Sequence, residues 1–196
     1  MPPRIRLIRL LIVPVVLLAL VTGPRLDEES LAGVLLASAG IFLVVLAAGG
    51  RVWASLYVAG KKNDTLVTDG PFSMVRNPLY FFSLIGFVGA GFAFGSATLA
   101  FGFAVVFFLT HWPTIHAEEK NLLGVFGPVY ERYRASVPRF IPNFGDLDLG
   151  DTVPVNPRNF ARALRDCMAI PLVLIVVEVV KWAQAASLLP VLIVLP

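Results

Sequence analysis

Two short polar clusters border apolar segments of the chain, and the first has the residue types of an anion site. It is the run Arg76-Asn77-Pro78-Leu79-Tyr80. Proline is favoured in the first turn of a helix, so Arg76 and Asn77 are predicted to lie just before a helix N-terminus. Free amides and the helix dipole favour an anionic group there, and Arg76 could hold a carboxylate or phosphate. The alternative is that Arg76 only anchors the chain at lipid headgroups.

The second cluster, His116-Ala117-Glu118-Glu119, follows a later apolar segment. Adjacent residues of a helix point about 100° apart, so only one of the two glutamates can easily face a shared site. A carboxylate there could accept hydrogen bonds from ribose hydroxyls or offset a ligand cation. The alternative is a solvated helix start, where acidic residues are favoured. His116 is either a base or a satisfied interfacial histidine.

The composition of the whole chain is that of a membrane protein. Of its 196 residues, 57% are hydrophobic and only 15% are charged, and the mean hydropathy is +0.80, whereas soluble domains carry about 25% charged residues. The net charge of +3 comes from basic residues at the ends of apolar runs, which indicates topology and not a nucleic-acid surface. The single cysteine, Cys167, excludes an intrachain disulfide, and no Cys/His spacing is typical of a zinc site, so we expect no metal.

The apolar segments predict the elements that position the two clusters: an all-α, polytopic integral membrane bundle with about five transmembrane helices. The expected helices cover residues 10–21, 31–48, 79–94, 97–109 and a segment that begins at 168. Residues 1–22 could instead be a signal peptide, but Thr22-Gly23-Pro24-Arg25 is a poor cleavage site. The third and fourth helices are short for a hydrocarbon core of ~30 Å, and we expect them to form a close hairpin with a turn at Gly95-Ser96.

The segment after this hairpin is polar but keeps a helical pattern. It covers residues 111–142, and Gly127-Pro128 should interrupt its helix. Residues 143–157 are acidic and rich in turn residues, which predicts a surface loop. A short basic helix at the membrane interface is expected over residues 159–165.

The last apolar segment carries one polar stripe. Glu178, Lys181 and Gln184 recur at steps of three, and charges at this depth should pair with each other or face the interior of the bundle. Residues 188–195 either continue this helix or form a short re-entrant tail.

The basic residues predict the orientation of the chain in the membrane. The N-terminus and residues 51–78 and 111–168 carry nearly all Lys and Arg, whereas residues 23–30 are net acidic. A cytoplasmic N-terminus followed by four crossings satisfies this distribution, with Trp53 and Tyr57 as interfacial anchors. Both polar clusters then face the cytoplasm, at the inner or plasma membrane if the chain is bacterial.

Part of the chain resembles the integral-membrane methyltransferases that include isoprenylcysteine carboxyl methyltransferases and phosphatidylethanolamine N-methyltransferases. The motifs that carry the resemblance are Leu66-Val67-Thr68-Asp69-Gly70-Pro71-Phe72, Arg76-Asn77-Pro78-Leu79-Tyr80, Glu118-Glu119-Lys120-Asn121-Leu122-Leu123, Phe126-Gly127-Pro128-Val129-Tyr130-Glu131-Arg132-Tyr133 and Val137-Pro138-Arg139-Phe140-Ile141-Pro142. The family pattern is Arg-His-Pro, any residue, Tyr, any residue, Gly. Asn77 replaces the histidine here, and Phe82 replaces the glycine. Because the asparagine amide neither takes up nor releases a proton at neutral pH, it cannot replace an imidazole in a proton-transfer step.

The resemblance implies a division of the chain into three parts. Residues 1–65 would hold N-terminal transmembrane helices and a cytoplasmic loop. Residues 66–142 would form the methyltransferase core, and residues 143–196 would supply the acidic loop, the interfacial helix and the last membrane helix.

The resemblance also implies S-adenosyl-L-methionine as the methyl donor and a lipid or small hydrophobic molecule as the acceptor. The residues expected to bind the donor are Arg76, Asn77, Pro78, Tyr80, His116, Glu118, Glu119, Tyr130 and Arg134, with adenine in an apolar pocket near Tyr130 or Tyr133. Phe82 and Arg139 are expected on the acceptor side. No residue is assigned as a catalytic base, because the reaction mainly needs alignment of nucleophile, methyl and sulfur. Two alternatives are an NADPH-dependent membrane reductase related to sterol reductases and a non-catalytic membrane scaffold or lipid-binding protein.

Overall fold

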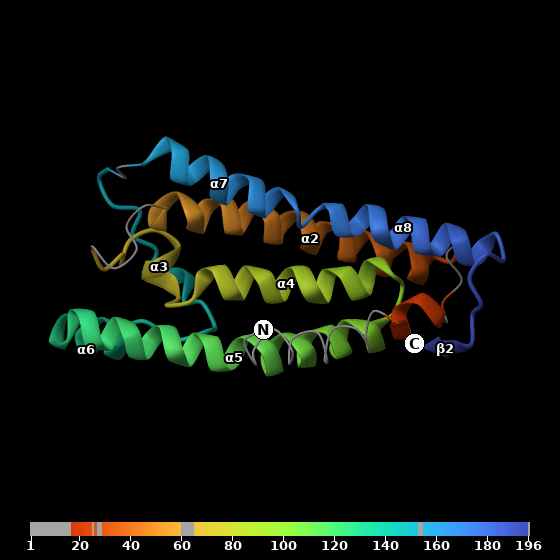
Figure 1. Ribbon diagram of the computed structural model, residues 1–196, viewed down its shortest axis with the longest axis horizontal. Helices are drawn as coiled ribbons and strands as arrows, with labels where there is room; N and C mark the ends of the chain where they lie inside the picture. The colour runs from red at the N-terminus through yellow and green to blue at the C-terminus, as the bar shows by residue number, and fades with distance from the viewer. Residues whose placement is uncertain (1–16, 25, 27–28, 60–64, 153–154, 196) are drawn as a thin grey trace, which may run out of the picture. The chain divides into compact units, whose positions relative to one another are not determined.

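The fold is described from a computed structural model, which covers residues 17–24, 26, 29–59, 65–152 and 155–195. The first expected helix therefore lies mostly outside the described residues, although residues 17–21 are helical. In chain order the elements are β1 (Thr22–Pro24), α2 (Leu31–Val58), α3 (Pro71–Met74), α4 (Pro78–Ala93), α5 (Ala97–Phe126), α6 (Pro128–Ser136), the 3-10 helix η1 (Phe144–Asp146), α7 (Pro157–Met168), α8 (Leu172–Ala185) and β2 (Ile193–Leu195) (Figure 1).

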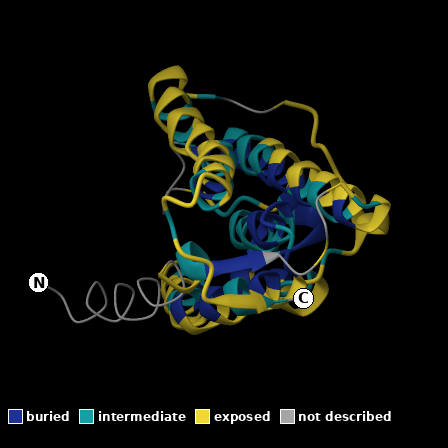
Figure 2. Ribbon diagram, turned by 90° about the vertical axis from the view of Figure 1, so that its right-hand side faces the viewer, coloured by how far each residue is buried: buried dark blue, intermediate teal, exposed yellow. Residues whose placement is uncertain are grey.

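The described residues form two compact units, each assembled from segments that are distant in sequence. The first unit is drawn from residues 1–46, 84–112 and 170–196, and the second from residues 47–83 and 113–169. Helices α2, α4 and α5 each contribute residues to both units. The helices carry buried residues along one side and exposed residues along the other, as helix packing requires (Figure 2).

Close backbone contacts hold the first unit together. A Cβ on Gly40 of α2 would lie 2.1 Å from the backbone nitrogen of Ala93, and one on Gly91 of α4 would lie 2.2 Å from that of Ala100. Only glycine permits such approach, so the backbones of α2, α4 and α5 meet directly at these points. The buried core beside them consists of Ala93, Phe94, Leu99, Val177 and Val180.

The described residues are mainly helical as predicted, but they also contain a small parallel sheet of two short strands. Strands β1 and β2 pair with Thr22 opposite Ile193 and Pro24 opposite Leu195. Residues 188–195 thus do not continue the last helix, and residues 193–195 form β2. Ser187 adopts a positive φ of 59° that ends the helix, and Pro190 lacks the amide needed to resume it.

The polar stripe on α8 pairs internally and ties the helix to β1. Lys181 lies 3.6 Å from the Glu178 carboxylate, which confirms the expected ion pair. The third member, Gln184, donates hydrogen bonds to the carbonyl oxygens of Leu20 and Thr22 at 3.0 and 3.1 Å. The stripe therefore has a structural role in the first unit.

Helix α5 differs most from the prediction. It continues past the expected end at residue 109 and through Pro113 as far as Phe126. Glu118 and Glu119 accordingly lie inside a helix and not at a helix start, which corrects the prediction. The change from apolar to polar residues does not end the helix, because Glu and Lys have nearly the same helix propensity as Leu. Gly127, with a φ of 50°, then separates α5 from α6 as expected.

Two other local predictions need adjustment. Helix α7 is longer than residues 159–165, because the Asn156 side chain accepts a hydrogen bond from the Asn159 amide and Pro157 starts the helix, which is a capping signal. Tyr57 is buried and donates to the Leu149 carbonyl at 3.2 Å, so it is not an exposed interfacial anchor. The turn at residues 95–96 is confirmed, with Gly95 at a φ of 82°.

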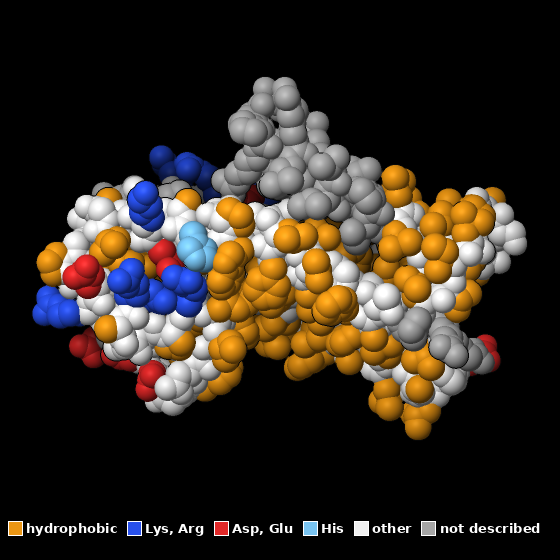
Figure 3. Space-filling view, turned by 90° about the horizontal axis from the view of Figure 1, so that it is seen from below, with side chains coloured by type: hydrophobic (Ala, Val, Ile, Leu, Met, Phe, Trp, Pro, Cys, Tyr) orange, Lys and Arg blue, Asp and Glu red, His pale blue; other side chains and the backbone are white. Residues whose placement is uncertain are grey.

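Membrane character rests on α2 and α5, which are long and apolar enough to cross a bilayer. Helix α4 has 16 residues, or about 24 Å at 1.5 Å per residue, and is shorter than the hydrocarbon core. Hydrophobic side chains form a broad expanse on the face seen in Figure 3. These features indicate a membrane protein, whereas five spans and a cytoplasmic site remain predictions.

Candidate active site

A cavity of about 400 Å³ lies within the second unit, beside the N-terminus of α4. Its walls are mainly apolar, with a few charged and amide groups, which is the usual make-up of a small-molecule site. The lining residues are Val58, Thr65, Leu66, Val67, Phe72, Arg76, Asn77, Pro78, Leu79, Tyr80, Glu118, Asn121, Leu122 and Tyr133.

The first polar cluster reaches this cavity because α4 begins where the sequence predicts. Pro78 is its first residue, and the Asn77 carbonyl accepts hydrogen bonds from the amides of Tyr80 and Phe81 at 3.1 and 3.0 Å. Arg76 and Asn77 therefore stand just before the helix, next to its positive dipole end. The Arg76 amide donates to the Pro138 carbonyl at 2.9 Å, which fixes the loop that carries both side chains.

The two adjacent glutamates of α5 have different surroundings. Glu118 lines the cavity together with Asn121 and Leu122, which follow it by three and four residues on the same helix face. Glu119 is only 7% exposed and does not line the cavity. Of the expected pair, Glu118 is the one available to a bound molecule.

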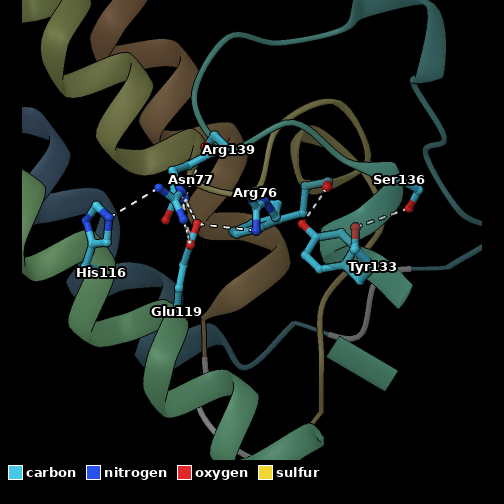
Figure 4. Close-up of polar contacts among 8 residues, drawn as sticks. Arg76, Asn77, His116, Glu119, Tyr133, Ser136 and Arg139 are labelled. Atoms are coloured by element: carbon cyan, nitrogen blue, oxygen red, sulfur yellow. Dashed lines mark hydrogen bonds and ion pairs between the residues drawn. The ribbon is translucent and has the colours of Figure 1, made fainter. Parts of the chain in front are cut away.

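The Glu119 carboxylate is fully engaged by three side chains (Figure 4). Its Oε1 accepts from the Asn77 amide at 2.9 Å and lies 3.7 Å from Arg76 NH1. Its Oε2 accepts from Nε and NH2 of Arg139 at 3.1 and 2.9 Å. Glu119 thus joins α5 to the loop before α4 and to the segment after α6. It holds these segments in place without bordering the cavity itself.

Asn77 uses both hydrogens of its amide in this network. One bonds Glu119 at 2.9 Å, and the other bonds the backbone carbonyl of Arg139 at 3.1 Å. A ring nitrogen of histidine has at most one hydrogen, so it could not make both bonds. Asn77 is therefore fitted to this network as a double donor.

The positive charge of Arg76 is balanced less completely by nearby negative charge than that of Arg139. Its side chain is 8% exposed, and its Nε and NH1 atoms have no hydrogen-bond partner in the described part of the chain. Glu119 makes its two short charged contacts with Arg139, and the Arg76 contact is longer. The network of two guanidiniums and one carboxylate leaves positive charge facing the cavity at Arg76.

Other residues expected at the site do not line the cavity. His116 is exposed, and its Nε2 lies 3.2 Å from NH1 of Arg139; because a guanidinium only donates, this imidazole nitrogen is the acceptor. Arg134 is exposed on α6, and Arg139 is held by Glu119. None of these three side chains borders the cavity.

Phe82 is also absent from the cavity wall and belongs to the core of the second unit. A Cβ added to Gly50 of α2 would come 2.2 Å from the Phe82 ring. The ring thus occupies space that a glycine of α2 leaves open. The Phe82 side chain therefore packs against α2 and does not border the cavity.

The two tyrosines of α6 are both buried, with different hydrogen bonding. Tyr133 lines the cavity and donates its hydroxyl to the Phe72 carbonyl at 2.7 Å. Tyr130 is 1% exposed, and its hydroxyl has no partner among the residues described. Burial raises the pKa of the Tyr130 phenol, Glu119 raises it further, and the Arg76 guanidinium partly offsets both.

Several lining residues were not predicted from the sequence to belong to the site. Thr65, Leu66 and Val67 reach the cavity from the loop after α2, and Asn121 and Leu122 from α5. A signal was present for the last two, since they follow Glu118 at helical spacing inside the Glu-Glu motif. Leu66 and Val67 stand at the start of the first motif that carries the family resemblance, whereas Thr65 lies outside every motif.

Comparison with known proteins adds an independent finding. Residues 29–129, more than half of the chain, match the model of the phospholipid methyltransferase family. The chain belongs to this family. The matched range includes the whole of α2, α4 and α5, and thus both polar clusters.

Relatives of this phospholipid methyltransferase family member have varied names. It is 36% identical to the nickel-cobalt-cadmium resistance protein NccN of Alcaligenes xylosoxydans xylosoxydans over 94% of this chain and 86% of the relative. It is 34% identical to the cobalt-zinc-cadmium resistance protein CzcN of Cupriavidus metallidurans over 79% and 71%. The protein-S-isoprenylcysteine O-methyltransferase of Schizosaccharomyces pombe is 37% identical over 43% of this chain and 37% of the relative. No solved structure matches the chain.

Proposed function

We propose that this protein transfers a methyl group from S-adenosyl-L-methionine to a lipid-like or small hydrophobic acceptor. The observation that carries the proposal is the cavity of the second unit, because it combines a buried arginine and a free carboxylate with apolar walls in a member of a methyltransferase family. Its volume of about 400 Å³ is in the range of small-molecule sites. We further propose that residues 66–142 are the catalytic core.

Each group of the donor has a complementary residue on the cavity wall. The positive charge of Arg76 suits the donor carboxylate. Glu118 can accept hydrogen bonds from the ribose hydroxyls. Leu66, Val67 and Leu122 offer apolar surface for adenine.

Methyl transfer from a sulfonium needs alignment more than acid–base chemistry. The nucleophile, the methyl carbon and the sulfur must be held in line, and this positioning can supply much of the rate enhancement. When the nucleophile is an anion, charge is lost in the transition state, so apolar walls that exclude water favour the reaction. We assign no catalytic base.

The acceptor is proposed to be membrane-borne. Helices α2 and α5, which are apolar enough to cross a bilayer, each contribute residues to the cavity wall. A lipid-soluble acceptor could enter from the bilayer, while the charged donor comes from water. In this proposal the protein is multi-pass, with a cytoplasmic N-terminus and active site.

Calorimetry in detergent with three ligands tests the proposal. We expect S-adenosylmethionine and S-adenosylhomocysteine to bind, and NADPH not to bind. Binding of NADPH alone would indicate a reductase. Folded protein that releases no heat with any of the three would support a scaffold and overturn the methyltransferase proposal.

The names of two relatives suggest a physiological context. Both are metal resistance proteins, and one aligns with 94% of this chain. We propose that the methylated product contributes to tolerance of nickel, cobalt and cadmium. This proposal is tested by the growth of a deletion strain in the presence of these metals. We expect the wild-type gene to restore growth and the Arg76→Ala variant not to restore it. Equal growth of the deletion strain and its parent would contradict the proposal.

A further inference from the structure

We infer that helix α7 binds anionic phospholipids of the membrane, with its arginines on the phosphate groups and an exposed apolar flank against the acyl chains. The helix lies outside residues 29–129, the range that matches the family model, and none of its residues lines the cavity. Lipid binding by α7 is therefore independent of the proposed methyl transfer and concerns how the second unit meets the bilayer.

One side of α7 packs on the protein, and an apolar flank beside it does not. Phe160, Ala163 and Cys167 recur at steps of three and four and are half-buried or fully buried. Leu164 and Met168 are 37% and 57% exposed, although both are large and apolar. At about 100° per residue they lie next to the packed side of the helix. An amphipathic helix with an exposed apolar flank is typical of the membrane interface.

The side beyond this flank is a basic stripe. Arg158, Arg162 and Arg165 are exposed and recur at steps of four and three, so their side chains share one face. Arg158 and Arg162 have no ion pair with a described residue. Arg165 lies 3.9 Å from its neighbour Asp166, with side chains 78% and 71% exposed, and such a surface contact contributes little. The arginine charges are thus available to an anionic partner.

Helix α2 places α7 at the level of the lipid headgroups. It has 28 residues, or about 42 Å at 1.5 Å per residue, and is longer than a hydrocarbon core of about 30 Å. Its C-terminal part carries Arg51 and is followed in the sequence by Lys61 and Lys62, as is usual where a helix leaves the bilayer. The Cys167 Sγ of α7 lies 3.9 Å from Ser55 Oγ in this part of α2. Helix α7 therefore packs beside the end of α2 that emerges from the hydrocarbon.

An anionic lipid suits both exposed sides of α7 at once. Its phosphate accepts hydrogen bonds from guanidinium groups, which are always charged, and its acyl chains cover Leu164 and Met168. Each basic residue close to an anionic membrane surface strengthens the attachment about fivefold. A phosphate ion or a nucleic acid backbone would meet the arginines only and would leave the apolar flank exposed.

Lipid enrichment in mixed micelles tests the inference on the full chain. The protein is equilibrated in detergent with equal amounts of phosphatidylglycerol and phosphatidylcholine and purified, and mass spectrometry quantifies the bound lipids. We expect the wild-type protein to enrich phosphatidylglycerol at least about fivefold. The triple variant Arg158→Gln, Arg162→Gln and Arg165→Gln should lose most of that enrichment. High ionic strength should weaken the enrichment too, because salt screens exposed charges.

The matched control removes the same charge elsewhere in the second unit. Lys120, Arg132 and Arg134 are exposed residues of α5 and α6, and glutamine at all three positions should leave the enrichment at the wild-type value. A further variant, Leu164→Gln with Met168→Gln, keeps the α7 arginines. It should retain at least about twofold less phosphatidylglycerol, because its flank no longer favours acyl chains.

Each result decides for or against lipid binding by α7. Wild-type protein without enrichment, or enrichment that survives the loss of the α7 arginines, would overturn the inference. An equal loss in the control variant would do the same, since it would show an effect of bulk charge, as would unchanged lipid retention in the flank variant. Circular dichroism and gel filtration establish folding, and Arg162→Gln alone, with a partial loss expected, serves if the triple variant does not fold.

Failure of this inference is distinguishable from failure of the proposed function. Affinity for S-adenosylhomocysteine should be unchanged in the α7 variants, because no α7 residue lines the cavity. Loss of lipid enrichment with normal binding of S-adenosylhomocysteine is therefore the result expected of the triple variant.

Discussion

Glu119 and Arg139 lie 2.9 Å apart and form an ion pair between α5 and the segment that follows α6. The same carboxylate binds Asn77 at the start of α4. One buried side chain therefore joins α5 to two chain segments whose contacting residues, Asn77 and Arg139, are 42 and 20 residues from it in sequence. This arrangement indicates a structural role for Glu119, whereas Glu118 borders the cavity and is the proposed ligand contact.

Glu119→Gln should lower stability. The substitution removes the negative charge that balances two arginines. Removing one partner of a buried ion pair lowers the free energy of unfolding by about 3–5 kcal/mol. Because the Arg139 side chain is 34% exposed, we expect a smaller loss of about 2–3 kcal/mol. Thermal unfolding in detergent measures this. An unchanged transition temperature would contradict the structural role.

Glu118→Ala should leave the stability of the protein unchanged and weaken ligand binding. The Glu118 side chain has no ion pair within the described residues, so the transition temperature should remain within about a degree or two of wild type. Because the same side chain lines the cavity, the affinity for S-adenosylhomocysteine should fall about tenfold. Lys120→Ala, an exposed neighbour outside the cavity, is the control. Normal ligand affinity in Glu118→Ala would argue against a ribose contact.

Asn77→His should destabilise the protein although it restores the residue usual in the family. The imidazole can replace only one of the two hydrogen bonds to Glu119 and Arg139, so we expect a loss of about 1 kcal/mol. Asn77→Asp should cost more, because it sets a second carboxylate beside Glu119. Chemical denaturation ranks the three proteins, and a histidine variant more stable than wild type would refute this account.

Gly50→Ala should destabilise the second unit by about 1–3 kcal/mol, because the new methyl would overlap the Phe82 ring. Phe82→Ala in the same chain should recover part of that loss, which a double-mutant cycle detects. Gly49→Ala is the control, since a Cβ there meets nothing within 4 Å, and it should be neutral or stabilising. Equal effects of the two glycine substitutions would rule out this packing contact.

Local signals in the sequence were sufficient for much of the helical structure. Pro78 predicted the start of α4, Gly127-Pro128 the end of α5, and Gly95 the turn before it. These succeed because proline and glycine constrain the backbone at their own positions. Predictions based on a change of polarity failed at Glu118, because a helix can pass from an apolar to a polar environment without ending.

The sequence by itself determined the membrane character, the family resemblance and the two polar clusters that contribute to one unit. Only the tertiary structure decided which residue of each cluster borders the cavity. Glu118 and Glu119 are equivalent in type, and the phase of α5 and the positions of Arg76, Asn77 and Arg139 separate their roles. Tyr130 and Tyr133 likewise share a residue type and a helix, but only Tyr133 borders the cavity. Such differences depend on contacts between residues far apart in the chain, which spacing within one motif does not encode.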